Sequence, residues 1–397
     1  MTKSHLNMLP LDGLRVVDLT HAGAGPYATM LLADLGADVV KVEPKKGDIF
    51  RNIYAGALTM NLRNKRSIAV DLKTEEGKEI LKRLVKNADV LVESFTPGTL
   101  ERMGFGFDDV CRINPQIVYC SLSGFGHTGP YARKRAFDPV IQAMCGNMAS
   151  TGEPDGEPVR TAGSFIDFGT GALLAFSILS ALILRDKTGK AQKVDISLFD
   201  TAVSFMGYWM TYYALTGELP EKMGTAYKAY APYKLFKTRT KSIYICVYDD
   251  KTWNNFCNAL GFENLKNNPK YSTNENRCRN REELERTIEE YLSKMDCEEV
   301  FEKLSNAGIP CGPMLTVADL LEHPQVLARN MIIKLKHPAK QIEVEAADIP
   351  VKIQGVEERI RYQPPKIGEH TLDVLREIGY TEDEISELKL KGIILLP

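Results

Sequence analysis

Residues 14–43 run LRVVDLTHAGAGPYATMLLADLGADVVKVE. The apolar stretch Leu14–Leu19 predicts a buried strand, and Asp38–Glu43 predicts a second one of the same kind. A glycine-containing turn, Gly23–Ala28, and a short amphipathic segment lie between them. The stretch therefore predicts a strand–turn–helix–strand unit, which is the building block of parallel sheets that bind nucleotides.

The glycine turn allows three interpretations. The pattern G-x-G-x-x-A, followed about 20 residues later by the carboxylate of Glu43, is a fingerprint of nicotinamide and flavin dinucleotide sites. Pro26 weakens that interpretation, because proline removes one of the N–H donors that would hold a phosphate. A plain strand–helix turn and a site for another nucleotide-bearing cofactor remain open.

The alternation of strand and helix signals continues to about residue 123. Further strands are expected at Ser67–Leu72, Ala88–Glu93 and Gln116–Ser121, with a helix over Thr74–Asn87. Such alternation predicts an α/β fold with a parallel sheet covered by helices.

A second α/β pattern begins near Pro232, with a strand at Ile243–Tyr248 and a helix at Lys251–Leu260. We therefore expect a large domain at 1–224, a small domain at 225–330, and a C-terminal segment, 331–397, that returns to the large domain.

Composition excludes several classes of function. A formal net charge of -2 in 397 residues gives no reason to expect a nucleic acid or an anionic membrane as partner. The eight cysteines form no C-x-x-C pair and are expected to be free thiols in a reducing compartment. Met1–Pro10 lacks a signal-peptide core, and the apolar run Gly169–Leu184 is shorter than the roughly 20 residues that span a bilayer. These features predict a cytoplasmic protein in which this run is a helix packed on nearly all faces.

Asp167 is the carboxylate of most chemical interest, because it immediately precedes that apolar helix. One interpretation is structural: an aspartate there caps the helix N-terminus. The other is catalytic: the helix dipole would hold the carboxylate ionised, and Phe165, Ile166 and Phe168 would exclude water. Gly169–Gly171 would then let a ligand approach the backbone, and their N–H groups would be candidate oxyanion donors.

Basic residues after the predicted strands favour an anionic ligand. Lys45, Lys46, Lys73 and Arg102 follow the second, third and fourth strands, and ligands of open α/β sheets lie at those strand ends. Arg133–Arg135 is a further candidate phosphate clamp. His127 stands in a glycine-rich loop, where solvent exposure is the usual state, and no residue spacing predicts a metal site.

Several motifs together resemble class III CoA-transferases, and the resemblance covers essentially the whole chain. They are LDGLRVVDLT at 11–20, GADVVKVEP at 36–44, NKRS at 64–67, PG at 97–98 with RMG at 102–104, SGFG at 123–126 with GP at 129–130, QA at 142–143 with Gly146, and GEHT at 368–371.

The resemblance implies a Rossmann-like large domain plus a smaller α/β domain, in an interlaced homodimer. It implies transfer of CoA from an acyl-CoA donor to a small free carboxylic acid through aspartyl anhydride and aspartyl-CoA intermediates, with Asp167 as nucleophile. CoA would be substrate, with no permanently bound cofactor. The implied CoA contacts are Gly23, Ala24, Lys45, Lys46, Val70, Asp71, Leu72, Lys73, Ser94, Phe95, Thr96, Arg102, Arg135 and Asp138.

Some positions depart from the family pattern. Ser94 and Thr96 stand where the family often has asparagine and a basic or polar residue, and Pro44 stands where some members have an arginine. The glycine run of formyl-CoA transferases is missing after Tyr208, and Phe137 stands where related racemases have a catalytic histidine. The alternatives are an acyl-CoA racemase that uses Asp167 and His127, an NAD-dependent dehydrogenase, and a non-catalytic CoA-binding module.

Overall fold

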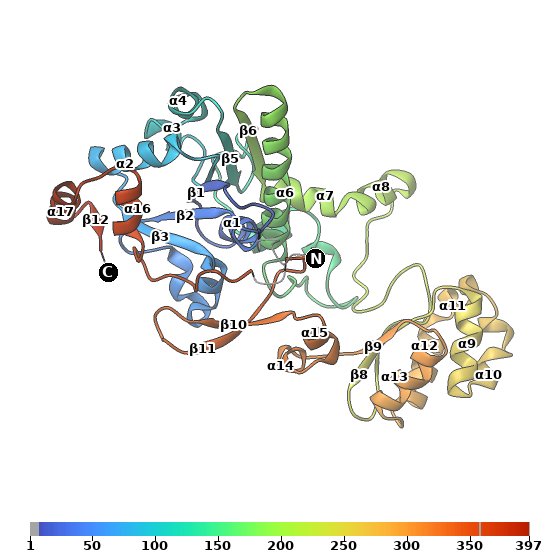
Figure 1. Cartoon of the computed structure of the whole chain (residues 1–397). Helices are drawn as coiled ribbons and strands as arrows, with labels where there is room; N and C mark the ends of the chain where they lie inside the picture. The colour runs from blue at the N-terminus through green and yellow to red at the C-terminus, as the bar shows by residue number, and fades with distance from the viewer. Residues whose placement is uncertain (1–7, 357–358, 397) are drawn as a thin grey trace. The chain divides into compact units, whose positions relative to one another are not determined.

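The computed structural model describes residues 8–356 and 359–396, so most of Met1–Pro10 lies outside the described residues. The chain forms two compact units (Figure 1). The larger unit comprises the chain up to Asn147, Arg160–Glu218 and the chain from Arg329 onward. The smaller unit comprises Met148–Val159 and Leu219–Ala328, and thus adds a short earlier segment to the expected 225–330.

A seven-stranded sheet forms the centre of the larger unit, in the order β12-β3-β2-β1-β4-β5-β6. All neighbouring strands pair in parallel except the edge strand β12, which runs antiparallel to β3. The α/β fold with a parallel sheet is therefore confirmed. The strands are β1 (Arg15–Leu19), β2 (Asp38–Glu43), β3 (Lys65–Val70), β4 (Val90–Glu93), β5 (Val118–Ser123), β6 (Gln192–Ser197) and β12 (Ile394–Leu395).

Helices cover both faces of this sheet, because successive strand residues point to opposite faces. Val16 packs into a core with α1 and α6, while its neighbour Val17 packs into a second core with α2, α16 and α17. The helical segments of this unit are α1 (Ala24–Asp34), η1 (Ile49–Leu62), α2 (Glu75–Lys86), α3 (Thr99–Arg102), α4 (Phe107–Ile113), α5 (Asp138–Met144), α6 (Phe165–Thr188), α7 (Leu198–Phe205), α8 (Gly207–Thr216), α16 (Thr371–Glu377) and α17 (Glu382–Leu390).

Helix α6 is longer and less covered than the sequence predicts. Among the described residues it is the one helix with the length and apolarity to cross a membrane, and 44% of its most apolar 18-residue window is buried. Phe176 is 67% exposed and Ile183 is 58% exposed. The expectation of a helix packed on nearly all faces is therefore wrong for the single chain: α6 buries one side and leaves an apolar side open.

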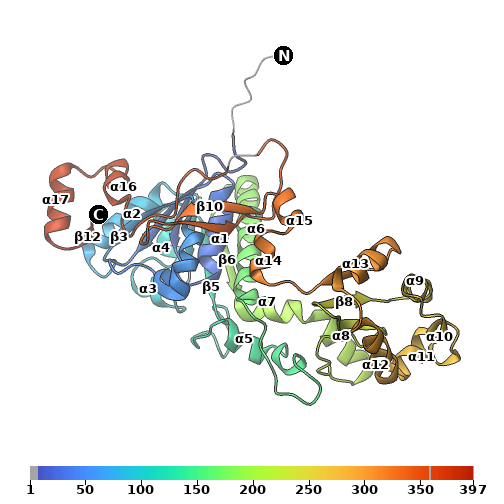
Figure 2. The ribbon, with the colours of Figure 1, turned by 90° about the horizontal axis from the view of Figure 1, so that it is seen from below.

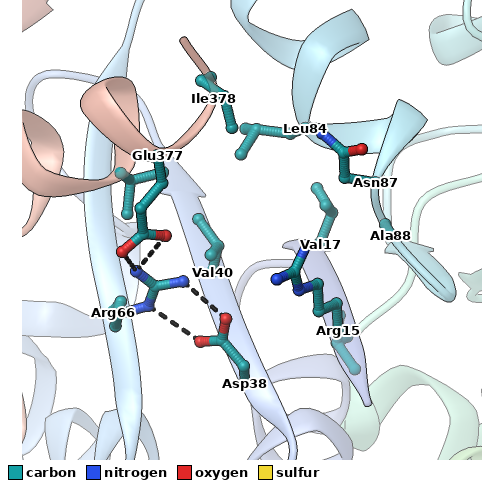
Figure 3. A pocket seen from close by; sticks show the side chains of 12 residues that line it. Arg15, Val17, Asp38, Val40, Arg66, Leu84, Asn87, Ala88, Glu377 and Ile378 are labelled. Carbon is teal, nitrogen blue, oxygen red and sulfur yellow. Dashed lines mark hydrogen bonds and ion pairs between the residues drawn. The ribbon is translucent and has the colours of Figure 1, made fainter. Parts of the chain in front are cut away.

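The C-terminal segment is fixed to the sheet beside β3, where Figure 1 shows the red helices next to the blue strands. Arg66 at the start of β3 donates to Asp38 through Nε (2.9 Å) and Nη2 (2.6 Å), and through Nη1 to both carboxylate oxygens of Glu377 at 2.7 Å (Figure 3). A cavity of about 230 Å³ lies beside this cluster, lined by Val17, Val40 and Leu84 among others. One partly buried guanidinium thus joins β2, β3 and α16.

A separate antiparallel hairpin, β10 (Ile332–Lys336) and β11 (Glu343–Ala347), lies beside α1 in the larger unit (Figure 2). The smaller unit has a three-stranded antiparallel sheet, β7-β8-β9, whose core contains Trp253, Phe256 and Leu284. Its elements are η2 (Met148–Ser150), β7 (Tyr233–Lys237), β8 (Ser242–Cys246), α9 (Asp250–Leu260), α10 (Glu263–Lys266), η3 (Pro269–Tyr271), α11 (Asn274–Arg279), α12 (Arg281–Leu292), α13 (Cys297–Asn306), β9 (Cys311–Pro313), α14 (Val317–Leu321) and α15 (Pro324–Ala328). All eight cysteines are free thiols.

Candidate active site

Asp167 lies in the first turn of α6 and contacts the turn that follows β1. A Cβ atom placed on Gly23 would lie 2.9 Å from Asp167 Oδ2, so only glycine allows the carboxylate to come this close to the backbone. Two residues that are far apart in the sequence, and that were both predicted for the site, therefore meet at the carboxyl edge of the sheet.

Asp138 holds the backbone under Asp167. Its Oδ2 accepts the N–H groups of Ile166 (2.8 Å) and Asp167 (3.1 Å), and its Oδ1 accepts the side-chain amide of Gln142. Gln142 Oε1 in turn accepts the N–H (3.0 Å) and the hydroxyl (3.1 Å) of Thr161. The structural interpretation of Asp167 as helix cap is therefore wrong: Ser164 occupies the N-cap position, and Asp138 satisfies the free N–H groups from another helix.

The surroundings of Asp167 favour its protonated form. Burial, and then the nearby charge of Asp138, raise the pKa of Asp167 to about 7. The sequence-based expectation that the helix dipole keeps this carboxylate ionised is thus reversed, because Asp138 already occupies the positive end of the dipole. A carboxylate poised near neutrality is a stronger nucleophile than an ordinary one, and perturbed pKa values of this size cluster at functional sites.

The glycines after Asp167 serve helix packing rather than ligand approach. A Cβ on Gly171 would lie 2.5 Å from the carbonyl oxygen of Ala24 in α1, and a Cβ on Gly169 would lie 2.7 Å from the ring of Phe205. Because α6 begins at Phe165, Gly169–Gly171 lie beyond the first turn, where helix N–H groups are already bonded. The expectation that their N–H groups act as oxyanion donors is therefore not supported by this geometry.

A pocket of about 740 Å³, here called the strand-end pocket, opens at the carboxyl ends of β1, β2 and β3. Seven of the predicted contact residues line it: Lys45, Lys46, Val70, Asp71, Leu72, Lys73 and Phe95. The sequence-based choice of the lysines after β2 and β3 therefore selects residues that share one cavity, as parallel strand ends require. Exposed ammonium groups beside apolar lining residues such as Val70, Leu72 and Phe95 suit a ligand that has both phosphates and an apolar arm.

The other predicted contacts lie outside this pocket. Gly23 and Ala24 are buried at the start of α1, and Ser94 bonds to His21. Thr96, Arg102 and Arg135 are exposed, with Arg102 donating to Thr99 Oγ1 at 3.0 Å. Asp138 is 2% exposed, and its carboxylate accepts hydrogen bonds from two N–H groups of α6 and from the side chain of Gln142 in α5.

Glu43 lines the same pocket, but its carboxylate is already used. It accepts Arg51 Nε at 2.8 Å, Ser67 Oγ at 2.7 Å and the Asp48 N–H at 3.0 Å. Glu43 therefore fixes the loop after β2, and it has little capacity left for the ribose of a dinucleotide.

A buried charge cluster under the pocket was missed by sequence reasoning. Asp18, Lys41 and Lys65 are each at most 1% exposed, with Lys65 Nζ 3.1 Å and Lys41 Nζ 3.7 Å from Asp18. Burial alone would raise the pKa of Asp18, but the two lysines hold it lowered to about 2. The sequence did contain a signal for this cluster, because charged residues interrupt the apolar runs of the predicted strands. In the structure these residues form ion pairs that join β1, β2 and β3.

His127 is not the exposed loop residue that the sequence predicts. Its side chain is 11% exposed, with Nε2 3.6 Å from Glu93 Oε1 and Nδ1 4.0 Å from Glu101 Oε1. The nearby carboxylate of Glu93 raises the pKa of His127, although burial opposes the shift. His127 thus ties the glycine-rich loop to the end of β4, and it does not line the strand-end pocket.

Comparison with known proteins agrees with this geometry. Residues 11–371 match the model of CoA-transferase family III. The acetyl-CoA:oxalate CoA-transferase of Acetobacter aceti is 36% identical, over 94% of this chain and 97% of that one. The succinyl-CoA:glutarate CoA-transferase of Homo sapiens is 34% identical, over 98% of this chain and 90% of that one. A crystal structure of a CAIB/BAIF family protein from Brucella suis superposes with a TM-score of 0.85 and 36% identity, covering 93% of this chain and 99% of that one.

The α/β fold, the strand-end pocket and these matches define one class of protein. The chain belongs to CoA-transferase family III, and the predicted family is confirmed. Its enzyme class is accordingly that of the CoA-transferases.

Proposed function

We propose that this enzyme moves CoA from a small acyl-CoA to a free carboxylic acid through covalent intermediates on Asp167. The observation that carries the proposal is the placement of a half-buried carboxylate, with its pKa raised to about 7, against Gly23 at the start of α1, two residues after His21 in the lining of the strand-end pocket. Such a carboxylate can serve as a nucleophile toward a thioester.

The reaction consists of two matched halves. An oxygen of Asp167 attacks the donor thioester, the C–S bond breaks, and an acyl-aspartyl anhydride and CoA thiolate form. The thiolate attacks the aspartyl carbonyl and releases the donor acid, leaving aspartyl-CoA. The acceptor carboxylate then attacks the carbonyl of aspartyl-CoA, which gives a second anhydride, between the acceptor and Asp167, and frees the CoA thiolate. The thiolate attacks the acceptor carbonyl of this anhydride, which forms the new acyl-CoA and regenerates Asp167. Each step is a displacement at an activated carbonyl, so the acceptor acid does not have to be activated separately before it reacts.

The residues of the strand-end pocket support CoA as the carrier. Lys45, Lys46 and Lys73 line one cavity and supply positive charge for phosphate groups. The apolar lining of Val70, Leu72 and Phe95 suits the pantetheine arm.

We infer that the exchanged acids are short mono- or dicarboxylates. Relatives named for acetyl-CoA and oxalate, and for succinyl-CoA and glutarate, match over nearly the whole chain. Because the glycine run of formyl-CoA transferases is missing after Tyr208, we expect acetyl or succinyl donors to be used in preference to formyl-CoA.

The decisive experiment is intact-mass analysis after mixing the enzyme with acetyl-CoA or succinyl-CoA. We expect a hydroxylamine-sensitive adduct of acyl or CoA mass that maps to Asp167, and none in Asp167→Asn. Label from D₂O at the α-carbon of the acyl group, without exchange of acid, would instead support a racemase. Wild-type protein that transfers CoA with no adduct, or Asp167→Ala with full activity, would refute the proposal.

We also infer that two copies associate through the open apolar side of α6 together with α8. Phe176 and Ile183 on α6 and Leu215 on α8 are 67%, 58% and 81% exposed, and exposed apolar surface of this extent marks an interaction site. Light scattering should give a dimer for the wild type and a monomer for Phe176→Glu/Ile183→Glu. A wild-type monomer at about 50 µM, far above the Kd of a stable dimer, would contradict the inference.

A further inference from the structure

His21 follows β1 and stands at the border between the strand-end pocket and Asp167. Its side chain lines the pocket, while Gly23, two residues further along, touches the carboxylate of Asp167. Sequence reasoning gave His21 no role. His21 is thus the part of the pocket lining that the chain joins most directly to the contact between Gly23 and Asp167.

Ser94 fixes the orientation of the His21 ring. The hydroxyl oxygen of Ser94 accepts the backbone N–H of His21 at 2.9 Å, and the same hydroxyl lies 3.0 Å from His21 Nδ1. A hydroxyl has one proton and two lone pairs, so the Ser94 hydroxyl can accept the amide proton and donate its own proton to Nδ1 at the same time. In that arrangement the imidazole proton lies on Nε2, the opposite ring nitrogen.

Burial favours the neutral form of the His21 ring. Burial, followed by the positive charge of Lys41, lowers the pKa of His21, while the carboxylates of Asp48, Glu93 and Asp18 oppose the shift. The ring of Phe95 packs against it, with ring centroids 5.9 Å apart. No residue that the structure describes accepts a hydrogen bond from Nε2, and that atom is not among the fully buried unpartnered ones, so its N–H is available to a ligand in the pocket.

A CoA-transferase that works through covalent intermediates needs an uncharged hydrogen-bond donor beside the sulfur of CoA. Between the two displacements the enzyme holds CoA as a free thiolate, which must stay bound and unprotonated until it attacks the aspartyl carbonyl. An imidazolium would protonate the sulfur, since an ordinary thiol has a pKa of about 8.5 and an ordinary imidazolium one of about 6.5. A neutral imidazole N–H can donate a hydrogen bond and keep its proton.

We propose that His21 is a catalytic residue whose Nε2–H donates a hydrogen bond to the CoA thiolate and holds the sulfur beside Asp167 between the two displacements. No proton moves in this contact: the C–S bond of the donor breaks, the sulfur accepts the hydrogen bond, and the same sulfur forms the new C–S bond at Asp167. The proposal rests on the proposed function, since it names the residue that serves the thiolate of that reaction.

The binding test uses CoA and desulfo-CoA, which lacks the sulfur, on an Asp167→Asn background in which no covalent step occurs. We expect CoA to bind about tenfold or more tightly than desulfo-CoA, because hydrogen bonds to charged groups are the strong ones. The preference should grow as pH rises from 6 to 8.5 and the thiol ionises. Equal affinity for the two ligands at every pH would overturn the proposal, whatever the fate of the covalent mechanism.

Two variants that replace His21 by an amide side chain distinguish the effect of the Nε2–H donor from the effect of the packing of the imidazole ring. Glutamine extends its amide to the position of Nε2, while asparagine reaches only the position of Nδ1 and keeps the contact with Ser94. His21→Gln should retain most of the preference for CoA over desulfo-CoA, and His21→Asn should lose it while binding desulfo-CoA as the parent does. If His21→Asn keeps the preference, or if both variants lose affinity for desulfo-CoA equally, His21 is a structural or phosphate-binding residue and the proposal fails.

The rate of the reaction gives a second test, in protein that carries the wild-type Asp167. His21→Asn should slow the attack of the thiolate by about 10²–10³-fold, the cost of losing one preorganised donor, with a much smaller change in KM. The acyl-aspartyl anhydride should accumulate at the expense of aspartyl-CoA, as hydroxylamine trapping would reveal. Unchanged partition between the two adducts would contradict the assignment. Absence of both adducts in the wild type would instead refute the covalent function and leave the binding result standing.

Discussion

At the scale of single residues, two carboxylates with opposite tasks lie next to each other. Asp138 accepts three hydrogen bonds, and its role is to hold the start of α6 and the side chain of Gln142 in place. Asp167 accepts no hydrogen bond from the described part of the chain, and burial raises its pKa to about 7. Two nearby carboxyl groups whose environments separate their roles are a recurring way to obtain one reactive group at neutral pH.

The raised pKa of Asp167 predicts that its ionised carboxylate destabilises the fold. A folded-state pKa of about 7, above the ordinary 3.8, means that stability from this group falls as pH rises from about 4 to 7 and then levels off. Asp167→Asn should therefore be more stable than the wild type by about 1–2 kcal/mol at pH 8 and nearly equal to it at pH 4. Urea unfolding at the two pH values measures the difference. An equal gain at both would show that the titration of Asp167 is not its source.

Asp138 should set the pH at which the enzyme loses activity. Its negative charge is the second cause of the raised pKa of Asp167, so Asp138→Asn should lower that pKa and move the acid limb of kcat/KM to lower pH. The variant should also lose about 1–2 kcal/mol of stability, because an asparagine amide would face the amide of Gln142.

The control is Asp138→Asn/Gln142→Glu, which restores a donor–acceptor match along the same contacts. It should recover stability relative to the single variant, as thermal unfolding would show. An acid limb that stays in place in Asp138→Asn would contradict the link between the two carboxylates.

The residues of this site could be predicted from the sequence only in part. Asp167 and the lysines of the strand-end pocket were identifiable, because their position next to a strand or helix end is a local property. The capping of α6 by Asp138 could not be, since it joins residues 29 positions apart through a tertiary contact. The raised pKa likewise depends on burial, which no local pattern gives.

At the scale of elements, α1 and α6 are held so close that glycine is required between them. An alanine at 171 would place its Cβ 2.5 Å from a backbone carbonyl, which cannot move aside without shifting a helix. Gly171→Ala should therefore destabilise the protein by about 1–3 kcal/mol, although alanine is the better helix former by about 1 kcal/mol. Chemical denaturation of the purified variant measures the loss.

Gly169→Ala is the matched control on the same helix. Its Cβ would meet only the ring of Phe205, which is 49% exposed and free to move. This variant should be near neutral, because the gain in helix propensity offsets the small adjustment. If both variants behave alike, the close approach of α1 does not explain the glycine at 171.

The strands were predictable at this scale, and the faces of α6 were not. The prediction at Asp38–Glu43 has the bounds of β2, because the valines of this segment are buried on both faces of the sheet. The predictions at Ser67–Leu72 and Gln116–Ser121 find β3 and β5 but are displaced by two residues. The same logic applied to α6 fails: an apolar run there predicts full burial, yet the single chain leaves Phe176 and Ile183 exposed. An apolar run shows that a helix surface is apolar, but it does not show whether the rest of this chain covers that surface.

At the scale of the whole molecule, charge is arranged locally rather than globally. The chain carries a formal net charge of -2, which gives no long-range attraction for a ligand with several phosphates. We therefore expect the affinity for CoA to come from the lysines of the strand-end pocket. Lys45 already donates to the carbonyl of Gly392, whereas the side chains of Lys46 and Lys73 make no hydrogen bond or ion pair within residues 8–356 and 359–396.

These lysines should therefore contribute unequally to CoA binding. Lys46→Ala and Lys73→Ala should each weaken CoA about three- to tenfold at low salt, Lys45→Ala less, and kcat should stay unchanged because the lysines bind the substrate and the transition state alike. The control is Lys187→Ala, an exposed lysine in the last turn of α6, which should bind as the wild type does. Calorimetric titration with CoA at 50 and 500 mM salt should show the wild type losing more affinity than Lys46→Ala/Lys73→Ala, since screening acts only on charges that are present. If the double variant binds CoA as tightly as Lys187→Ala does, the phosphates lie elsewhere and the strand-end pocket holds another part of the substrate.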